Sequence, residues 1–426
     1  MRSPLGTLTA LYVTQYLGIG FITVGLTAIL RDGGTSLDTL ALLQFVGLIW
    51  PIKFLWAPLL DRFGSRRLGH YRSWLLVAQG GLVLALLALL PYSRPAGQLG
   101  PIVAICAAYV LLSATQDIAV DAVAVRVLSE RARGVGNGVQ VAASYVGNLL
   151  GGGACVVVYD RYGWVPAILL LAGLTAVGLV VAWRFREPAR LDRPTGAGQA
   201  YRALWSVFGQ PGCRWWTFGV VPLVYTGAGA AYAVVSPALV DAGWSLARIG
   251  LVTGVVTSAP AVVAGMVAGA LVGRFGRAAV LVAAGVALAA STAALLPLLT
   301  GRAPLGPTVL ALSAFMAAYT AANVVLYTVN MDYSRPGTGG TDFTVLSSFG
   351  LVCSFVSASL GLVAAARFGY PAVAVGSVVL VAAGVAVGVA HQRRHPRPAQ
   401  AAPAAAATAP TAPAGPAAAT TGRTRP

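Results

Sequence analysis

Residues 102 to 125 read IVAICAAYVLLSATQDIAVDAVAV. The stretch is long and apolar enough to cross a bilayer as one helix, which takes about 20 such residues. It nevertheless carries two carboxylates, Asp117 and Asp121, four positions apart and therefore on one helix face. An ionisable group at membrane depth costs about 2.5 to 3.5 kcal/mol on insertion scales, so it persists where it faces a protein interior or a water-filled cavity. The stretch predicts a membrane helix whose acidic face belongs to a pathway for ions or solutes.

The rest of the chain has the same membrane character. Hydrophobic residues make up 57% of it and charged residues only 10%, whereas ordinary soluble domains hold about 25% charged residues. We therefore predict an all-α integral membrane protein of twelve transmembrane helices. The predicted spans are Leu8 to Leu30, Thr39 to Leu60, Trp74 to Pro91, Ile102 to Val125, Val135 to Val158, Val165 to Ala182, Trp215 to Val240, Ile249 to Val272, Ala279 to Leu299, Val309 to Asn330, Phe343 to Ala366 and Ala372 to His391.

The arginines orient these spans, because cytoplasmic loops collect basic residues. With the amino terminus inside, 22 arginines fall in cytoplasmic segments and 6 in outer loops, and 22 plus 6 accounts for all 28. Both termini are expected in the cytoplasm, and the excess of arginine over lysine favours a bacterial plasma membrane. Because the charge of +17 is spread over these loops, it does not indicate nucleic-acid binding.

The histidines and cysteines of the chain argue against an enzyme. The three histidines, His70, His391 and His395, lie in a cytoplasmic loop or at the start of the tail, outside any apolar pocket, so no membrane-buried general base is expected. The four cysteines have no paired spacing, so neither disulfides nor a metal site is predicted, and no cofactor is expected. No Walker A loop occurs, which argues against ATP as the energy source. We expect a monomer in the lipid bilayer that binds a small-molecule substrate and a proton.

Two segments recur along the chain. Asp61-Arg62-Phe63-Gly64 reappears as Gly273-Arg274-Phe275-Gly276, and Arg161-Tyr162-Gly163 as Arg367-Phe368-Gly369. The offsets of 212 and 206 residues predict two six-helix units of equal direction. The predicted domains are an N-terminal bundle at 1–184, a cytoplasmic linker at 185–213, a C-terminal bundle at 214–391 and a disordered tail rich in Pro, Ala and Thr at 392–426.

Six plus six parallel repeats joined by a basic loop resemble the major facilitator superfamily. The run Asp61-Arg62-Phe63-Gly64-Ser65-Arg66-Arg67 is similar to the signature loop of that superfamily between spans two and three. The usual pattern has Gly four residues before the Asp, where this chain has Ala57. Residues 50–62 and 113–121 resemble the group of muropeptide permeases and acetyl-CoA transporters. Residues 136–140, 151–153 and 340–344 are more similar to its ferric-siderophore permease branch.

A buried ion pair is expected between the second and fourth spans. Lys53, the only lysine, lies about 12 Å from the cytoplasmic end of its span, and Asp117 lies at similar depth. The resemblance makes these spans neighbours, so a Lys53–Asp117 pair would neutralise two costly charges. The alternative is that Lys53 extends to the lipid headgroups and leaves Asp117 protonated. Asp117 is our first candidate for proton coupling. Asp342 is the second, although a helix-capping role suits it equally.

The signature loop predicts a conformational latch. By resemblance, Asp61 caps the eleventh span while Arg62, Arg66 and Arg67 meet an acid at the base of the fourth, here Asp121. These contacts would favour the outward-open state and break when the halves rock. The alternative is an ordinary basic loop with screened surface charges. Asp332 at the base of the tenth span is a further candidate for pairing between the halves.

The predicted substrate site consists of neutral polar side chains in the membrane core. They suit a bulky, neutral or zwitterionic solute held by hydrogen bonds and aromatic faces, although packing is an alternative for each one. The candidates are Gln15, Tyr16, Gln116, Gln140, Tyr145, Asn148, Tyr225, Asn323 and Tyr327.

These observations predict a secondary active transporter that works by alternating access. Its expected cargo is an amphipathic metabolite, a ferric siderophore first and a cell-wall muropeptide second, taken up with protons. The fifth span lacks the glycine-proline pattern associated with antiporters of the superfamily, which favours uptake. Export of a drug or natural product by proton antiport is the alternative.

Overall fold

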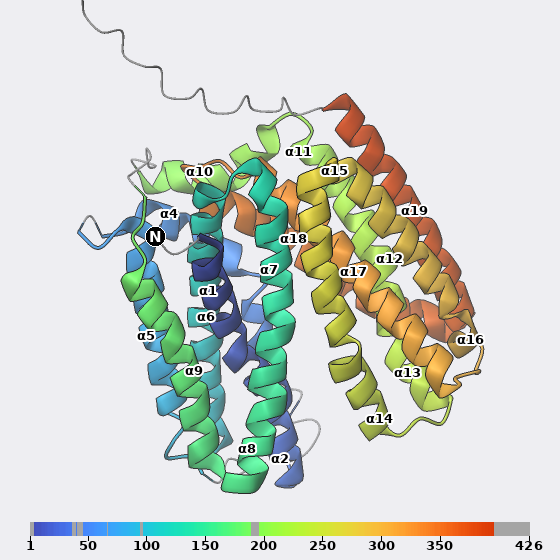
Figure 1. Ribbon diagram of the computed structural model, residues 1–426, viewed down its shortest axis with the longest axis horizontal. Helices are drawn as coiled ribbons and strands as arrows, with labels where there is room; N and C mark the ends of the chain where they lie inside the picture. Colours follow the sequence, from blue (N-terminus) through green and yellow to red (C-terminus); the bar gives the residue numbers. More distant parts are fainter. Residues whose placement is uncertain are drawn as a thin grey trace, which may run out of the picture.

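The computed structural model describes residues 4–35, 40, 46–65, 67–93, 97–188 and 196–395. These residues form helices and turns, with one isolated bridge between Ser65 and Gly69. Two helical bundles stand side by side (Figure 1), one ending at Arg184 and the other starting at Cys213. The end of the bundles at which the connecting helix α10 lies is called the linker end below. The predicted tail lies outside the described residues from position 396 onwards.

The N-terminal bundle begins with a long first helix and includes a broken second span. Pro51 and Pro58 flank the break and cannot donate backbone hydrogen bonds within a helix. As a result, short 3₁₀ turns replace a continuous helix around Lys53. The elements are α1 (Pro4–Gly20), η1 (Phe21–Leu26), α2 (Thr27–Asp32), η2 (Val46–Ile49), η3 (Lys53–Leu55), α4 (Ala57–Arg62), α5 (His70–Leu87), α6 (Leu99–Val127), α7 (Glu130–Asn148), η5 (Leu149–Ala154), α8 (Cys155–Tyr162) and α9 (Trp164–Arg184).

The C-terminal bundle repeats this plan after the connector. Gly276 has a φ of 83°, a left-handed value that favours glycine, and it interrupts α15 between two of the predicted spans. The elements are α10 (Ala197–Ser206), η6 (Val207–Gly209), α11 (Cys213–Trp215), η7 (Trp216–Val220), α12 (Val221–Ala233), α13 (Val235–Asp241), α14 (Leu246–Leu251), η8 (Val252–Val256), α15 (Ser258–Ala294), α16 (Leu296–Leu299), α17 (Leu305–Tyr333), α18 (Gly339–Phe368) and α19 (Tyr370–Arg394).

Nine helices in the described ranges are long and apolar enough to cross a membrane. One of them, Arg248–Leu299, covers two predicted spans on either side of Gly276. The predicted third span corresponds to α5, which is not among the nine, and the second is only partly described. The all-helical membrane architecture is confirmed. The count of twelve spans and the sidedness of the termini stay predictions.

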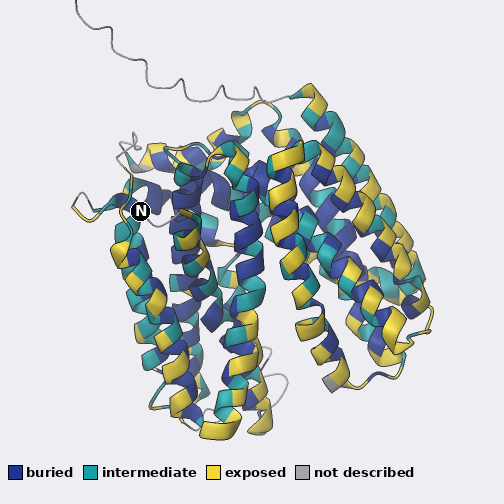
Figure 2. Ribbon diagram, in the orientation of Figure 1, coloured by how far each residue is buried: buried dark blue, intermediate teal, exposed yellow. Residues whose placement is uncertain are grey.

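Exposed residues lie along the outside of both bundles (Figure 2), and many of them are large and apolar. Leu84, for example, is 67% exposed on α5 and Leu310 is 72% exposed on α17. Monomeric soluble proteins rarely expose so much apolar surface, and where they do it marks a contact with another protein, a ligand or a membrane. These faces are therefore suited to contact lipid, in keeping with the composition of the chain.

The two bundles approach each other most closely through glycines on α7 and α15. A Cβ atom on Gly134 would lie 2.6 Å from the carbonyl oxygen of Gly269, and one on Gly138 would lie 2.6 Å from that of Gly265. Any side chain at these positions would push the helices apart. Small residues at four-residue spacing let membrane helices pack backbone to backbone, and this contact closes the linker end of the molecule.

Candidate transport site

The charged centre of the molecule lies inside the N-terminal bundle. Lys53 from η3 forms an ion pair with Asp117 on α6, and each residue is only 2% exposed. Gln15 on α1 donates a hydrogen bond to Asp117 Oδ1 at 2.5 Å. The Lys53 ammonium also lies 5.2 Å from the ring centroid of Trp50. The structure thus places Lys53 inward on Asp117, so the two charges compensate each other within the bundle.

Asp121 lies one turn further along the same face of α6 but has different partners. Its Oδ1 accepts hydrogen bonds from the hydroxyl of Tyr12 at 2.8 Å and from Nε2 of Gln140 at 3.0 Å. The residue is completely buried. The expected contact between Asp121 and the arginines of the signature loop is therefore corrected, because the carboxylate faces α1 and α7 inside the bundle.

Asp61 joins the two bundles at the linker end. Its Oδ2 accepts a hydrogen bond at 2.8 Å from the backbone N–H of Thr341, in the first turn of α18. Its Oδ1 accepts one at 2.6 Å from the hydroxyl of Tyr71. A carboxylate at a helix N-terminus is stabilised by unpaired N–H groups and by the helix dipole. This geometry is the helix cap that the sequence predicts for Asp61.

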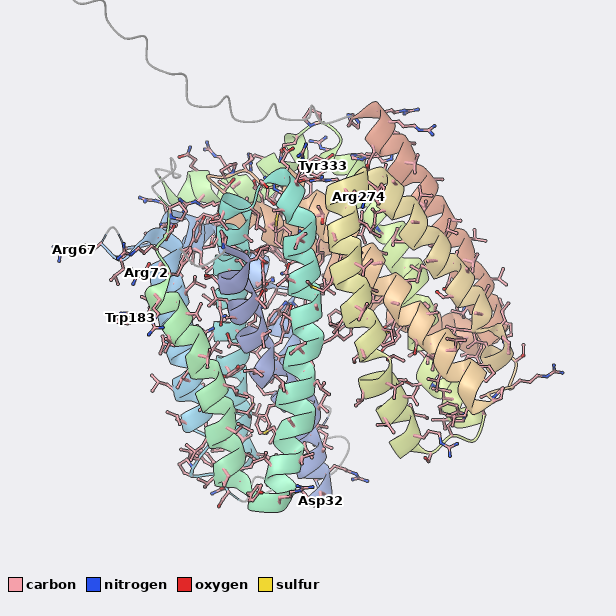
Figure 3. The ribbon with its side chains drawn as sticks, viewed as in Figure 1. Asp32, Arg67, Arg72, Trp183, Arg274 and Tyr333 are labelled. Atoms are coloured by element: carbon pink, nitrogen blue, oxygen red, sulfur yellow. The ribbon has the colours of Figure 1, made fainter. Side chains whose placement is uncertain are left out.

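The loop arginines take other positions. Arg62 stacks its guanidinium on the ring of Phe63, 5.5 Å from the centroid. Arg67 is exposed and projects away from the helices (Figure 3). Arg66 lies outside the described residues. In the described part of the loop, the contact between the bundles thus rests on Asp61.

Asp342 is engaged with Arg335 just before α18. The Arg335 side chain donates to the Asp342 carboxylate at 2.7 and 2.8 Å, and its backbone N–H donates at 2.9 Å. The Thr338 hydroxyl adds a fourth hydrogen bond at 3.0 Å. Hydrogen bonding to Asp342 raises the pKa of Arg335 above its ordinary value. Because a fixed cation neutralises Asp342, this ion pair suits a structural role at the start of α18 better than that of a proton carrier.

A second contact between the bundles is formed by Asp332 and two arginines, of which the sequence indicated only Asp332. Asp332 at the end of α17 pairs with Arg133 of α7 at 2.9 Å and with Arg277 at 3.0 Å. Arg277 also donates to the backbone oxygen of Glu130 at 2.8 Å. Asp332 was a candidate for such pairing, but neither arginine was predicted as its partner. For Arg277, its position directly after the repeated motif at 273–276 was the available signal.

A cavity of about 160 Å³ lies between the bundles. Five tyrosines line it, together with two amides, two serines and two aliphatic side chains, and both bundles contribute. None of these side chains is charged at neutral pH. The lining residues are Tyr16, Gln140, Val141, Ser144, Tyr145, Tyr225, Tyr319, Asn323, Tyr327, Leu351 and Ser354.

Hydrogen bonds hold several of the lining groups in place. Tyr145 and Thr320 share a hydrogen bond of 3.0 Å across the two bundles. Within the C-terminal bundle, the Tyr225 hydroxyl donates to Asn323 Oδ1 at 2.7 Å. On the opposite wall the ring of Tyr16 stacks on Trp50 with centroids 5.8 Å apart. The cavity therefore offers both aromatic faces and fixed polar groups.

Six of the nine predicted substrate residues line this cavity, and three do not. Gln15 bonds to Asp117, as described above, and Gln116 donates to the backbone oxygen of Leu11 at 3.0 Å. Asn148 is exposed beside Gly20. Ser144 and Ser354 line the cavity but were not predicted, since single serines in apolar helices carry no distinctive signal.

Metal binding finds no support in the part of the chain that the structure describes. No group of three or more His, Cys, Asp or Glu side chains that could hold a metal ion occurs there. The four cysteines are free thiols. The chemistry available in the described site is hydrogen bonding, aromatic contact and proton transfer at carboxylates.

Residues 8–233, more than half of the chain, match the family model of the Major Facilitator Superfamily. The chain belongs to this superfamily of membrane transporters. It is 32% identical over 176 residues to an uncharacterized protein of Haemophilus influenzae, covering 41% of each chain. It is 32% identical over 154 residues to the anhydromuropeptide permease of Escherichia coli K12, covering 36% of this chain and 31% of the permease. The matched segments thus span less than half of these relatives.

Solved structures share the fold at low sequence identity. The human organic anion transporter MFSD10 has a TM-score of 0.71 at 15% identity, over 90% of this chain and 98% of that one. The transporter FucP in its outward conformation has a TM-score of 0.69 at 13% identity, over 92% and 99% of the two chains. At these identities the similarity establishes the architecture of the molecule and leaves its substrate open.

Proposed function

We propose that the chain is a secondary active transporter that imports a bulky amphipathic metabolite across the inner membrane of a bacterium by alternating access. The observation that carries the proposal is the cavity between the bundles, lined by phenols and amides from both. A site shared by two bundles can be exposed to either side of a membrane as they rock against each other. The first candidate substrate is an anhydromuropeptide and the second a ferric siderophore.

The relatives determine this order of candidates. The sequence alone put the siderophore first, but a relative that is 32% identical over 154 residues is named an anhydromuropeptide permease. A cell-wall fragment offers sugar hydroxyls and peptide amides, which match tyrosine faces and the amides of Gln140 and Asn323. Uncharged walls suit such a solute better than a strongly anionic one.

The size of the cavity adds a requirement. Drug-sized ligands occupy pockets of about 300 to 1,000 Å³, which exceeds the cavity of about 160 Å³ seen here. A bulky solute therefore needs the bundles or the lining side chains to move apart. The contacts of Asp61 and Asp332 hold the linker end together in this structure. If that end faces the cytoplasm, as the arginines predict, the structure corresponds to a state closed on the inside.

Proton coupling is the proposed energy source. The buried Lys53–Asp117 pair lies beside the cavity, since Gln15 bonds Asp117 while the next residue, Tyr16, lines the cavity wall. Buried carboxylates with shifted proton affinity are typical of coupled transporters. Asp342 is the weaker candidate of the two, because it pairs with Arg335 at the start of α18 and does not line the cavity.

Uptake into membrane vesicles tests this proposal. Labelled anhydromuropeptide and iron-loaded siderophore are supplied separately, with and without an imposed pH gradient. We expect anhydromuropeptide to accumulate only when the gradient is present. Accumulation of the siderophore alone would reverse the order of the candidates. Outward flux of another compound, with no accumulation of either, would replace import by the export alternative.

A further inference from the structure

Asp121 differs from the other buried carboxylates described here. Asp117, Asp332 and Asp342 each form an ion pair, and both oxygens of Asp61 accept hydrogen bonds. Asp121 has hydrogen bonds from neutral donors only, both to Oδ1, while its completely buried Oδ2 has no hydrogen-bond partner among the described residues. Within the described part of the chain, this carboxyl group therefore has no ion-pair partner of its own.

The count of charges in the described core of the N-terminal bundle also leaves Asp121 without a paired cation. Asp117 and Asp121 lie on one face of α6, and Lys53 is the cation that neutralises Asp117. One ammonium compensates one carboxylate. An isolated ionised carboxylate in an apolar interior is so unfavourable that the group binds a proton instead. When Asp121 is protonated, only one hydroxyl is left without a partner, and burying it costs far less free energy than burying an unpaired carboxylate.

The other ionisable groups on the elements around α6 do not supply a second cation. On α1, Tyr12 is the donor to Asp121, and Tyr16 lines the cavity. On α5, Tyr71 donates to Asp61 of α4. Several charged side chains of these elements have partners of their own near the linker end: Arg72 contacts the end of α9, Arg126 pairs with Glu187, Arg133 pairs with Asp332, and Asp342 of α18 pairs with Arg335.

Gln140 connects Asp121 to the cavity. Its Nε2 donates to Asp121, its side chain is part of the cavity lining, and its Oε1 is buried without a hydrogen-bond partner. A solute that bonds to Gln140 changes the strength or orientation of this donor. The proton affinity of Asp121 then depends on the occupancy of the cavity, and by linkage the affinity for the solute depends on the proton.

We propose that Asp121 is the group that binds and releases the coupling proton, and that Gln140 is the positioning residue that connects it to the substrate. This inference rests on the proposed proton-coupled transport and moves the proton from Asp117, which forms the ion pair with Lys53, to Asp121. Binding forms one O–H bond on the Asp121 carboxyl with a proton from water that enters the cavity. Release returns that proton to water on the other side of the membrane.

Infrared spectroscopy of the full-length protein in liposomes tests the assignment without any substrate. We expect the wild type to show a carbonyl band of a protonated carboxylic acid that disappears as the pH is raised. The band should be absent in Asp121→Asn and present in the double variant Lys53→Met/Asp117→Asn, which removes the other candidate. A band that survives in Asp121→Asn and vanishes in the double variant would assign the proton to Asp117 and overturn the proposal.

A second variant keeps the test decisive if Asp121→Asn does not fold. Gln140→Leu removes a hydrogen bond from the ionised form of Asp121, so the pH midpoint of the band should rise by about one unit. An unchanged midpoint overturns the role of Gln140. Accumulation of labelled anhydromuropeptide in the same liposomes is measured separately. A wild type that shows the band but accumulates nothing contradicts the proposed substrate while supporting the proton site.

Discussion

The two bundles share a plan but differ in the chemistry of their cores. The N-terminal bundle buries Lys53, Asp117 and Asp121. The corresponding spans of the C-terminal bundle, within residues 216–240, 249–273, 278–299, 305–331, 343–366 and 370–390, contain no charged residue in their sequence. Their polar contacts are neutral, such as Trp216 Nε1 to Asn330 Oδ1 at 3.0 Å. The two halves share a helical frame, whereas the charges in the core of the spans lie in one half.

The linker end shows the same asymmetry. The repeat offset of 212 residues aligns Asp61 with Gly273. Asp61 caps α18 of the other bundle with its carboxylate, whereas Gly273 packs directly on the opposite backbone, where a Cβ would lie 2.9 Å from the Arg131 carbonyl oxygen. One side of the closure is thus electrostatic and the other steric. The two contacts should respond differently to substitution.

The largest effect is expected from breaking the ion pair in the charged bundle. Lys53→Ala leaves Asp117 buried without its cation, and removing one partner of a buried pair costs about 3 to 5 kcal/mol. Thermal unfolding of the purified protein should show a clear loss of stability, and transport should be lost. The double variant Lys53→Ala/Asp117→Asn should recover much of the stability. Equal damage in the single and double variants would mean that the two charges do not depend on each other.

The steric side of the closure is tested by Gly134→Ala. The added methyl group would collide with the Gly269 carbonyl oxygen, and overpacking of this kind costs about 1 to 3 kcal/mol. Spin labels at the exposed positions Arg67 and Phe275, in an otherwise cysteine-free chain, should report a longer distance between the bundles. Gly173→Ala is the matched control, because nothing lies within 4 Å of its Cβ position. An unchanged distance in Gly134→Ala would contradict the close packing of α7 on α15.

The electrostatic side is tested by Asp61→Asn. The amide keeps the shape of the cap but loses the charge that interacts with the N-terminus of α18, worth about 0.3 to 1 kcal/mol. The same pair of labels should show a smaller shift toward the open population than in Gly134→Ala, with reduced transport. Asp32→Asn serves as control, since Asp32 is exposed at the opposite end of the molecule (Figure 3). Normal transport by Asp61→Asn would indicate an ordinary surface loop.

The sequence predicts the frame of this molecule better than its contacts. The positions of the helices can be predicted from apolar runs and glycines, because they depend on local composition. The break at Gly276, for example, falls between two predicted spans. The pairing of Lys53 with Asp117 could be anticipated, because the two opposite charges lie at similar depth in spans that the family resemblance makes neighbours. The partners of Asp121 could not, because the direction of its carboxyl depends on the rotation of α6 against α1 and α7. Tyrosines at the cavity wall and tyrosines in packing also look alike in sequence.

The smallest effect is expected in the neutral bundle. Tyr225→Phe removes the hydrogen bond that fixes Asn323 in the cavity wall, worth about 1 kcal/mol, so KM for anhydromuropeptide should rise about fivefold. The pH profile of uptake should stay unchanged, because this residue touches no group that binds the proton. Tyr162→Phe, with a side chain 69% exposed on the outside of the other bundle, should change neither quantity. A shifted pH profile in Tyr225→Phe would show that the neutral bundle also takes part in proton coupling, and the division between the two halves would then be wrong.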